Sequence, residues 1–519
     1  MKKMPSILND VIGPIMRGPS SSHTAASWRI ARTCLDILNE ELDEALIEFD
    51  ENGAWAPNYR EQGTCMGIDG GLLGLRITDE RMKDTTAVAR EQGIKIKYDV
   101  SSFPTNHANT ARLTLRGKSG RKMQVVAIST GGGAFKIQTV DGFNVRFQGD
   151  LFGLVFFASN KVSLLEKLKD IAPASYEFSV QEVEGRYCFQ AKSPKSFPAR
   201  LAEKIQQIET VDHVALINPV LPVLSGQESE MPFDTIQSLI DYAEETNSDL
   251  GDLGLLYEKC RSGFSVLELR ELMDILRGMV DESINIGLKG TRYRDRILQQ
   301  QSHLIGKAEQ NGTIPKSIIN TIVANVSALM ESKSAMEVIV AIPTAGSCGT
   351  VGGSLRALAD SLGSTNNERL KAYYAAGIVG AYFAMGPGFS AEEHGCQVEC
   401  GAASGMAAAG LVQLMGGTAK QALGAATMAI QNMIGLVCDP VADRVEVPCL
   451  GKNISAAVNA YSSAIMAISG YDPVIPLDQV IETVSRVSST MPTCVKCTGK
   501  GGLAITKTAF EIKKRLILK

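Results

Sequence analysis

The spacing of hydrophobic residues changes twice along the chain, and each change marks a part with a different expected architecture. Residues 24–42 have a helical period, whereas 111–117 and 122–129 alternate between apolar and polar residues as strands do. The second strand-like segment runs into the glycine triplet 131–133, where the backbone must turn sharply or approach a ligand closely. This mixture predicts an N-terminal α/β domain over residues 1–150.

A shorter pattern follows over residues 151–222. Strand-like segments at 151–159, 174–184, 186–193 and 213–224 alternate with helix-like segments at 162–172 and 199–211. Their order, βαββαβ, is that of a small ferredoxin-like α+β module. The order is common in regulatory modules, but it does not by itself identify a ligand.

Beyond the polar linker candidate 225–232 the pattern is helical almost throughout. We expect an all-α catalytic domain over residues 232–519, which makes the chain a multidomain protein. Between Glu399 and Asp439 the only charged residue is Lys420, and glycines interrupt the run repeatedly. A membrane span needs about 20 mostly apolar residues, so we favour closely packed buried helices over a membrane segment.

Composition narrows these expectations. The chain of 519 residues suits roughly two to four domains, and its net charge of −4 gives no reason to expect nucleic acid or an acidic membrane as a partner. The first residues lack an apolar run long enough for a signal peptide, so we expect a cytoplasmic protein. Eleven cysteines, an odd number without a secretory signal, favour metal binding or catalysis over a disulfide framework.

The stretch IMRGPSSSHTAAS at 15–27 places His23 among small hydroxyl residues. A turn at 18–19 is followed by a helix that we expect to begin near His23 and to continue to Leu38. Two interpretations remain open. One of the serines 20–22 caps this helix, or the hydroxyls, the helix end and the imidazole together bind a small carboxylate. In either case, so polar a segment is not expected in the core.

Three cysteines stand where helices are expected to stop or start. Cys396 lies in a glycine-flanked loop, Cys438 precedes Asp-Pro and Cys449 follows Pro448, so all three are expected at non-helical corners. Their wide spacing differs from zinc-finger and compact ferredoxin patterns. It fits a [4Fe–4S] cluster with one iron free of cysteine, which can act as a Lewis acid. The alternative is that the thiols are buried as small hydrophobic groups.

The segment PTAGSCGTVGG at 343–353 is a second candidate anion site. Backbone N–H groups around Gly346 and the hydroxyls of Thr344 and Ser347 are suited to cradle a carboxylate. The segment lacks the Gly-Lys-Ser/Thr ending of a phosphate-binding loop. A simple tight turn is the alternative.

Together these segments resemble the iron–sulfur-dependent L-serine dehydratases, also called L-serine ammonia-lyases. GPSSSHT at 18–24, HANTARLTL at 107–115 and STGGG at 129–133 resemble motifs of that family's β part. PTAGSCG, EEHGCQ, ASGMAAAG, GLVCDPV, VEVPC and TGKGGLA resemble its α part, in order over nearly the whole chain. The resemblance implies β and α parts fused in one chain, with an ACT-like regulatory module between them.

The resemblance also implies an activity. L-serine loses water with the help of a [4Fe–4S] cluster and yields pyruvate and ammonia, in an oxygen-sensitive step of amino-acid catabolism and gluconeogenesis. His23 donates a hydrogen bond or moves a proton beside the substrate carboxylate, and a homodimer is expected. The residues assigned to catalysis are Ser20, Ser21, His23, Thr24 and Thr64, those assigned to substrate binding are His107, Asn109, Thr344, Gly346 and Ser347, and the cluster ligands are Cys396, Cys438 and Cys449.

The chain departs from the family pattern in two places. A Gly-His-(Gly/Ala)-Thr-Asp motif of relatives falls on EQGTC at 61–65, where Gln62 replaces the histidine and Cys65 the aspartate. Glutamine cannot transfer a proton at neutral pH, so the protein uses another group, prefers another substrate or is impaired. The alternatives to serine dehydration are β-elimination on another small amino acid such as L-cysteine, and an amino-acid sensor without turnover. Some relatives supply a fourth cluster cysteine from a C-terminus that here reads EIKKRLILK, and Cys494 and Cys497 are the nearby candidates.

Overall fold

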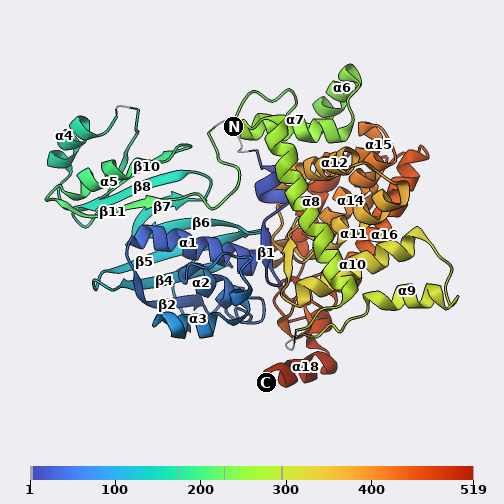
Figure 1. Cartoon of the computed structure of the whole chain (residues 1–519), viewed down its shortest axis with the longest axis horizontal. Coiled ribbons are helices and arrows are strands. Elements are labelled where there is room, and N and C mark those ends of the chain that lie inside the picture. Colours follow the sequence, from blue (N-terminus) through green and yellow to red (C-terminus); the bar gives the residue numbers. More distant parts are fainter. Residues whose placement is uncertain (1–3, 174, 227, 294–295, 518–519) are drawn as a thin grey trace.

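The computed structural model describes residues 4–517 except 174, 227 and 294–295. An α/β region and a helical region lie side by side, and a smaller module extends from the α/β region (Figure 1). The expected mixed N-terminal part and helical C-terminal part are therefore confirmed. Within the described ranges, no helix combines the length and apolar character needed to cross a lipid bilayer.

The α/β region is a sheet with strand order β3-β2-β4-β5-β6-β7, antiparallel except for the β2–β3 pair. Residues of β5 alternate between buried and exposed, and the buried face packs beneath helix α1 through Ile30, Leu113 and Val125. The elements are α1 (Ala26–Leu38), β2 (Leu42–Asp50), α2 (Thr64–Leu72), α3 (Thr85–Gln92), β3 (Lys95–Ser101), β4 (Thr110–Gly117), β5 (Lys122–Gly131), β6 (Ala134–Val140) and β7 (Phe143–Phe147).

The segment before α1 differs from two expectations: that a serine caps the helix, and that the segment lies outside the core. A π-helical turn, Ser21–Ala25, precedes the helix, and the side chain of Ser20 makes no capping hydrogen bond. The prediction that the segment lies outside the core is wrong, because His23 and Thr24 are 0% exposed. Burial is tolerated because the polar side chains bind one another and distant polar groups, which a local sequence pattern does not reveal.

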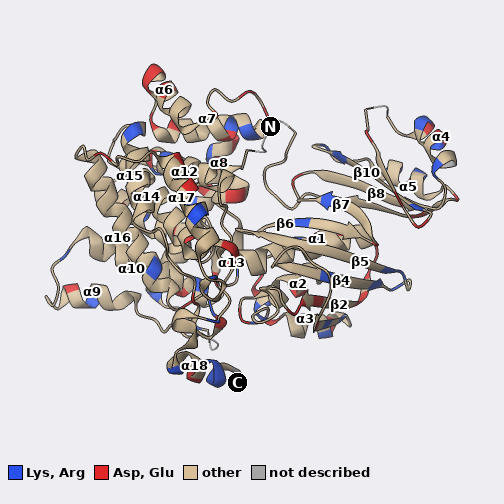
Figure 2. Cartoon of the chain, turned by 180° about the vertical axis from the view of Figure 1, so that it is seen from behind, with Lys and Arg blue, Asp and Glu red and all other residues tan. Residues whose placement is uncertain are grey.

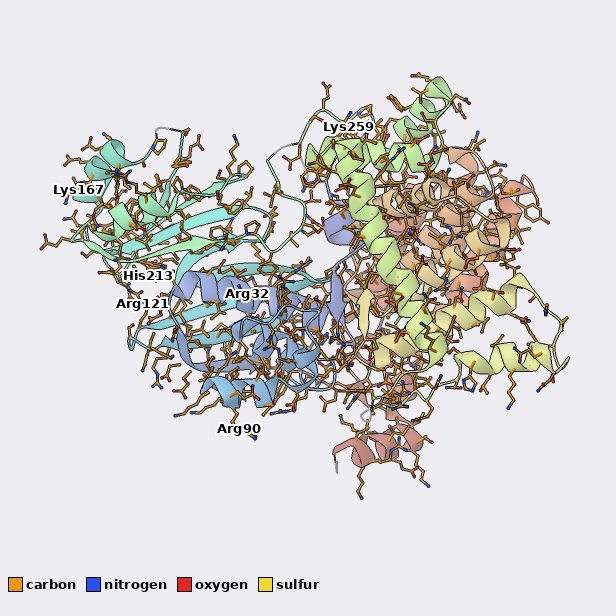
Figure 3. All side chains as sticks on the ribbon, viewed as in Figure 1. Arg32, Arg90, Arg121, Lys167, His213 and Lys259 are labelled. Carbon is orange, nitrogen blue, oxygen red and sulfur yellow. The ribbon has the colours of Figure 1, made fainter. Side chains whose placement is uncertain are left out.

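The module has the βαββαβ order, and its antiparallel sheet has strand order β11-β8-β10-β9. His213 lies where the module meets the α/β region (Figure 3), and its Nε2 is 2.6 Å from the carbonyl oxygen of Ile37 in α1. This contact ties the last strand of the module to the first helix. The elements are β8 (Phe152–Ala158), α4 (Lys161–Ile171), β9 (Ser179–Val183), β10 (Arg186–Ser193), α5 (Ala199–Gln206) and β11 (Val211–Ile217).

Small residues let the helices of the helical region pack closely. A Cβ atom at Gly405 would lie 2.6 Å from Ile430, and Ala402 and Ala403 are 0% exposed. The elements are α6 (Ile236–Thr246), α7 (Leu250–Ser262), α8 (Val266–Lys289), α9 (Ser302–Gln310), α10 (Ile318–Ser334), β12 (Val338–Val340), α11 (Cys348–Leu362), α12 (Asn366–Met385), α13 (Ala391–His394), α14 (Cys400–Leu414), α15 (Ala419–Gln431), α16 (Cys449–Ile468), α17 (Leu477–Thr490) and α18 (Lys507–Ile517).

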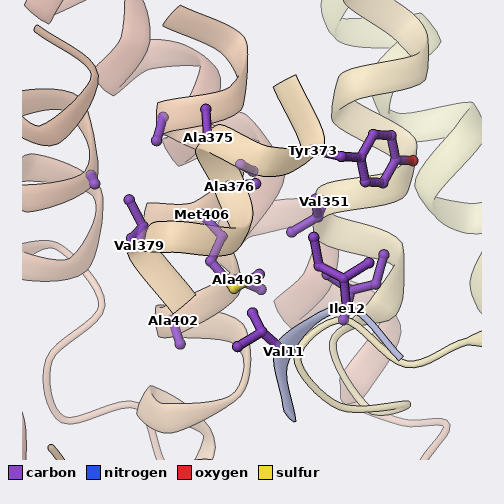
Figure 4. Packing of buried hydrophobic residues seen from close by; sticks show 14 of the residues in the cluster. Val11, Ile12, Val351, Tyr373, Ala375, Ala376, Val379, Ala402, Ala403 and Met406 are labelled. Atoms are coloured by element: carbon purple, nitrogen blue, oxygen red, sulfur yellow. The ribbon is translucent and has the colours of Figure 1, made fainter. Parts of the chain in front are cut away.

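Residues 4–17, here called the N-terminal arm, leave the α/β region and enter the helical one. In the helical core, Val11 lies near Met406 and Ala403, and Ile12 lies on the side of Val351 (Figure 4). The arm ends in β1 (Ile15–Arg17), which pairs antiparallel with β12. The arm therefore belongs to the hydrophobic core of the helical region, while helix α1 and the sheet form a core of their own.

Glu258 of α7 anchors the start of the arm. Its buried carboxylate accepts hydrogen bonds from the Ser6 hydroxyl at 2.5 Å and from the Ile7 N–H at 2.6 Å. The carboxylate thus satisfies backbone and side-chain donors at the beginning of a short π-helical turn, Ile7–Val11.

Candidate functional site

Short helix α13 lies at the boundary between the two regions, where acidic and basic side chains are interspersed (Figure 2). Its residue Glu392 accepts a hydrogen bond from the Ser22 hydroxyl at 3.0 Å. The Ser21 hydroxyl in turn accepts the N–H of Ala345 at 3.2 Å. The serine-rich segment of the α/β region therefore faces the loops of the helical region.

His23 is the centre of a buried polar group that we call the histidine cluster, formed by Ser20, Ser22, His23, Asn58 and Glu392. Its Nε2 lies 3.1 Å from Asn58 Oδ1, and its Nδ1 lies 3.0 Å from the Ser20 hydroxyl and 3.2 Å from the Ser22 hydroxyl. With Asn58 Oδ1 assigned as the acceptor, the ring proton is on Nε2, and Nδ1 accepts from the Ser20 hydroxyl, because Ser22 donates its proton to Glu392.

Electrostatics keep His23 neutral. Burial lowers the pKa of His23 below its usual range, while the Glu392 carboxylate, 3.6 Å from Nδ1, acts in the opposite direction. A neutral imidazole has a basic ring nitrogen, Nδ1, and the nearby Glu392 carboxylate can take up a proton from it. The cluster is therefore equipped for proton transfer.

Three other predicted residues lie near this cluster but make different contacts. The Thr24 hydroxyl donates to the backbone carbonyl of Gln62 at 3.2 Å. The Thr64 hydroxyl is buried and has no hydrogen-bond partner among the described residues. Cys65 lines a cleft of about 940 Å³ that also borders α18. Thr64 is thus available to a ligand, whereas Thr24 supports the loop that carries Gln62.

The predicted anion cradle at 343–353 holds a carboxylate of the protein itself. The Thr344 hydroxyl donates to Glu399 at 2.7 Å, and the Ser347 hydroxyl lies 3.1 Å from that of Thr344. A Cβ atom at Gly346 would lie 2.9 Å from the Glu399 carboxylate, so this close approach requires glycine. Burial raises the pKa of Glu399 to about 7. The loop is therefore suited to carboxylate binding, and its backbone also turns tightly.

His107 and Asn109 lie on the loop before β4. His107 Nδ1 accepts the N–H of Asn109 at 3.1 Å, and His107 Nε2 is 3.7 Å from Glu393. The amide of Asn109 and the hydroxyl of Ser129 are buried without a partner within the described part of the chain. Buried polar groups of this kind are normally paired, so these two point to a ligand that completes them.

Four buried cysteines, Cys396, Cys438, Cys449 and Cys497, form what we call the thiol cluster. The Sγ atoms of Cys396 and Cys438 and a carboxylate oxygen of Glu399 all lie within 4.8 Å of one another. The prediction of three non-helical corners is wrong for Cys449, which is the first residue of α16. Proline ends the loop at 448, and its fixed φ permits a helix to start directly after it.

Buried cations accompany the thiols. Lys333 is 0% exposed and its Nζ donates to the carbonyl of Val445, in the loop that leads to Cys449. Lys452 Nζ donates to Asp439 at 2.6 Å. Burial raises the pKa of the Cys449 thiol, and the charge of Lys333 opposes that shift.

This donor set fits a soft metal centre. Thiolates are soft ligands that favour iron–sulfur clusters and zinc, and the ammonium groups of Lys333 and Lys452 offset part of the negative charge that such a centre brings. The pKa of Cys438 is raised by its contacts with the Cys396 and Cys497 thiols and by burial. Metal binding therefore has to displace thiol protons.

Sequence reasoning missed several members of the site. Four buried polar groups of the site were not selected from the sequence: Asn58, Glu392, Glu399 and Lys333. Asn58 and Lys333 are 2% and 0% exposed, the Glu392 side chain is 4% exposed, and the Glu399 carboxyl is buried. A usable signal existed for two of them, because Glu392 and Glu399 flank Cys396 in EEHGCQVEC. No local pattern marks Lys333, whose place follows from the packing of α10.

Comparisons with known proteins extend this picture. The model of the family described as serine dehydratase alpha chain matches residues 201–504. The Bacillus subtilis protein named probable L-serine dehydratase, alpha chain, is 34% identical over 290 residues, which are 55% of this chain and 95% of that protein. The L-serine dehydratase alpha chain of Peptoniphilus asaccharolyticus is 32% identical over 54% of this chain and 97% of its own length. The probable L-serine dehydratase beta chain of Bacillus subtilis is 33% identical over 34% of this chain and 78% of its own length.

Proposed function

The chain belongs to the serine dehydratase alpha chain family, and on this premise we propose that it is an L-serine dehydratase, a lyase that converts L-serine into pyruvate and ammonia. The observation that carries the proposal is the meeting of the histidine and thiol clusters at the boundary of the two regions. Gln62, one loop away from His23, places its Nε2 4.0 Å from the Sγ of Cys497. A proton-transfer group and a metal centre thus face one site.

The proposed cofactor is a [4Fe–4S] cluster held by Cys396, Cys438 and Cys449. When bound, such a cluster supplies a Lewis-acidic iron that makes the substrate hydroxyl a better leaving group. The soft donor set and the buried lysines support this assignment. We expect the activity to be lost in air and to return with ferrous iron and a thiol.

The remaining chemistry is assigned to side chains. We propose that the hydroxyls of Ser20, Ser21 and Thr24, together with the 343–353 loop, hold the substrate carboxylate, with His107 and Asn109 as further binding residues and Thr64 beside the reacting carbon. His23 takes up a proton at Nδ1 and passes it through the Ser22 hydroxyl to Glu392. Holding the substrate in place is essential, because the carboxylate does little to acidify the Cα proton.

Finer features of the proposal concern organisation. We propose domains at 1–150, 151–222 and 232–519, with the βαββαβ module acting as an ACT-like domain that responds to amino acids. We further propose a cytoplasmic homodimer that takes a small amino acid as substrate and has no nucleic-acid partner. A role in gluconeogenesis follows from pyruvate as the product.

A second activity, β-elimination of sulfide from L-cysteine, is favoured by one observation. Gln62 is 1% exposed and contacts the thiol cluster, yet its amide cannot act as an acid or base at neutral pH. A substrate with a better leaving group than hydroxide needs less proton transfer. An amino-acid sensor without turnover is the remaining alternative.

A substrate screen on anaerobically reconstituted protein separates these activities. Pyruvate formation from L-serine that exceeds formation from L-cysteine supports the proposal, and the reverse order supports the second activity. If the protein binds small amino acids and carries a loaded cluster but turns none of them over, the amino-acid sensor is the alternative that remains. Gln62→His is the informative variant, because a gain on L-serine alone assigns the preference to this position.

A further inference from the structure

We infer that Cys497 supplies a fourth thiolate to the metal centre of Cys396, Cys438 and Cys449. The inference rests on the proposed iron–sulfur function and deepens it, since three cysteines leave one iron without a thiolate. Three kinds of observation carry it: the burial of Cys497, the backbone hydrogen bonds that fix its position, and the polar group that faces its sulfur.

Cys497 belongs to the same buried group as two of the other ligands. It is 5% exposed, against 2% for Cys396 and 4% for Cys438, and the three pack together with Ala391 and beside Leu436. The Cys438 thiol is in hydrogen-bonding contact with the thiols of both Cys396 and Cys497. Three sulfur atoms from distant points of the chain, those of Cys396, Cys438 and Cys497, therefore converge on one buried place.

Backbone hydrogen bonds hold Cys497 against Cys438. The N–H of Cys438 donates to the carbonyl of Val495 at 2.8 Å, and the N–H of Cys497 donates to the carbonyl of Cys438 at 3.0 Å. Cys497 also has a φ of +59°, in the left-handed region that residues with a side chain seldom occupy. Such a conformation persists only where surrounding contacts determine it, and it recurs at functional sites.

The neighbouring cysteine, Cys494, differs from Cys497. Cys494 is exposed, and it is absent from the buried group of thiols within the described residues. Position in the fold thus distinguishes Cys497 from the other cysteine nearby in sequence.

Gln62 gives the second independent observation. Its Nε2 is directed at the Sγ of Cys497 from the α/β region, at 4.0 Å. An N–H donor stabilises a thiolate more than a thiol, because hydrogen bonds to charged acceptors are the stronger ones. Gln62 is therefore better suited to donate a hydrogen bond to a ligand thiolate than to act as a catalytic base.

The consequence is a centre without an open position in the resting protein. Cys497 would hold the fourth iron of a bound cluster, and the Lewis acidity of that iron would be open to a substrate only where Cys497 does not occupy it. An iron held by Cys497 would also be lost in air more slowly than an iron at a site with three cysteines.

Iron retention tests the inference in the full-length protein. Wild type, Cys497→Ser, Cys497→Ala and the control Cys494→Ser are reconstituted anaerobically with ferrous iron and sulfide and are then oxidised briefly. We expect both Cys497 variants to lose one iron per cluster roughly tenfold or more faster than wild type, the scale on which metal sites respond to a lost partner, and to give the electron paramagnetic resonance signal of a three-iron cluster. Cys494→Ser is expected to behave as wild type.

Equal rates of iron loss in wild type and in both Cys497 variants, all with a loaded cluster, would overturn the fourth ligand while leaving the proposed function intact. A wild type that takes up no cluster would instead contradict the proposed function. Mössbauer spectra of wild type loaded with isotopically enriched iron keep the inference testable if the variants fail to fold. Without substrate we expect only thiolate-ligated iron, and one distinct iron in each cluster would refute it.

Discussion

The histidine cluster and the thiol cluster are neighbours, yet they consist of different kinds of side chain. The first joins three separate segments through Ser22, Asn58 and Glu392, and its hydrogen bonds are complete without any ligand. The second brings together thiols, which are weak hydrogen-bonding groups, beside the buried ammonium of Lys333. Folding therefore completes the contacts of the first cluster, whereas we propose that a bound metal completes those of the second.

This difference predicts how each cluster fails. Loss of a member of the histidine cluster leaves buried polar groups without partners, so stability and proton transfer fall together. Loss of a thiol removes a metal ligand but little hydrogen bonding, so the metal is lost while the fold survives. The predictions below exploit that contrast.

The largest effect is expected from the thiol cluster. Replacing Cys396, Cys438 or Cys449 by serine should abolish iron–sulfur absorbance and activity together, since each supplies a ligand. Anaerobic iron and sulfide analysis with a pyruvate assay measures both. Serine at Cys34, Cys188 or Cys260, which are far from the cluster in sequence, is the control and should leave iron content nearly unchanged. Full iron content in Cys438→Ser would refute the ligand assignment.

His23→Ala should reduce turnover by roughly 10²-fold or more, the scale of a lost proton-transfer group. Because His23 is fully buried and paired on both ring nitrogens, the free energy of unfolding should also fall, by about 1–3 kcal/mol. Steady-state kinetics and denaturant unfolding report the two effects. His303→Ala, at an exposed position of α9, is the control. Unchanged turnover with verified cluster content would remove His23 from the mechanism.

Glu258 provides a buried carboxylate outside both clusters. Burial raises the pKa of Glu258 from 4.5 to about 7, so between these values the folded protein binds a proton that the unfolded chain does not. Wild type should therefore lose stability relative to Glu258→Gln as pH rises through this window, by about 3 kcal/mol in all. Unfolding curves at pH values below and above the window measure the difference. Parallel pH dependence of the two proteins would contradict this account.

The smallest effect is expected from Ser22→Ala, which interrupts the path between His23 and Glu392 but leaves Ser20 on Nδ1. One hydrogen bond contributes about 1 kcal/mol, so turnover should fall about fivefold with the cluster intact. The pH profile of kcat should change with it, because Glu392 no longer communicates with the imidazole. A loss as large as that of His23→Ala would place Ser22 in direct contact with the substrate instead.

Much of the fold was predictable because its signals are local. The strand predicted over 186–193 has the bounds of β10, and the helix predicted over 199–211 starts with α5 but is longer than α5, which ends at Gln206. The candidate ligand cysteines were selected because proline and glycine stand beside them, although Cys449 begins helix α16 and does not lie in a loop. These features depend on neighbours in sequence, which a single chain displays.

The remaining features depend on neighbours in space. Glu392 and Ser22 are hydrogen-bonded although they are 370 positions apart in the sequence, and no pattern around either residue predicts the contact. The burial of His23 was mispredicted because polarity was read without the partners that compensate it. Cys497 could be named as a candidate, but its selection over Cys494 required the left-handed turn that faces it toward Cys438.

The N-terminal arm has a consequence for assembly. Two parts of this chain are similar to proteins that are named as separate alpha and beta chains, and a contact between separate chains depends on their encounter by diffusion. Here the arm buries Val11 against Gly380 of α12, and the linkage makes that encounter intramolecular. Its effective concentration is then set by the length of the connecting chain and reaches the millimolar range for short links. Fusion thus makes docking of the two halves independent of dilution, with no additional contact between them.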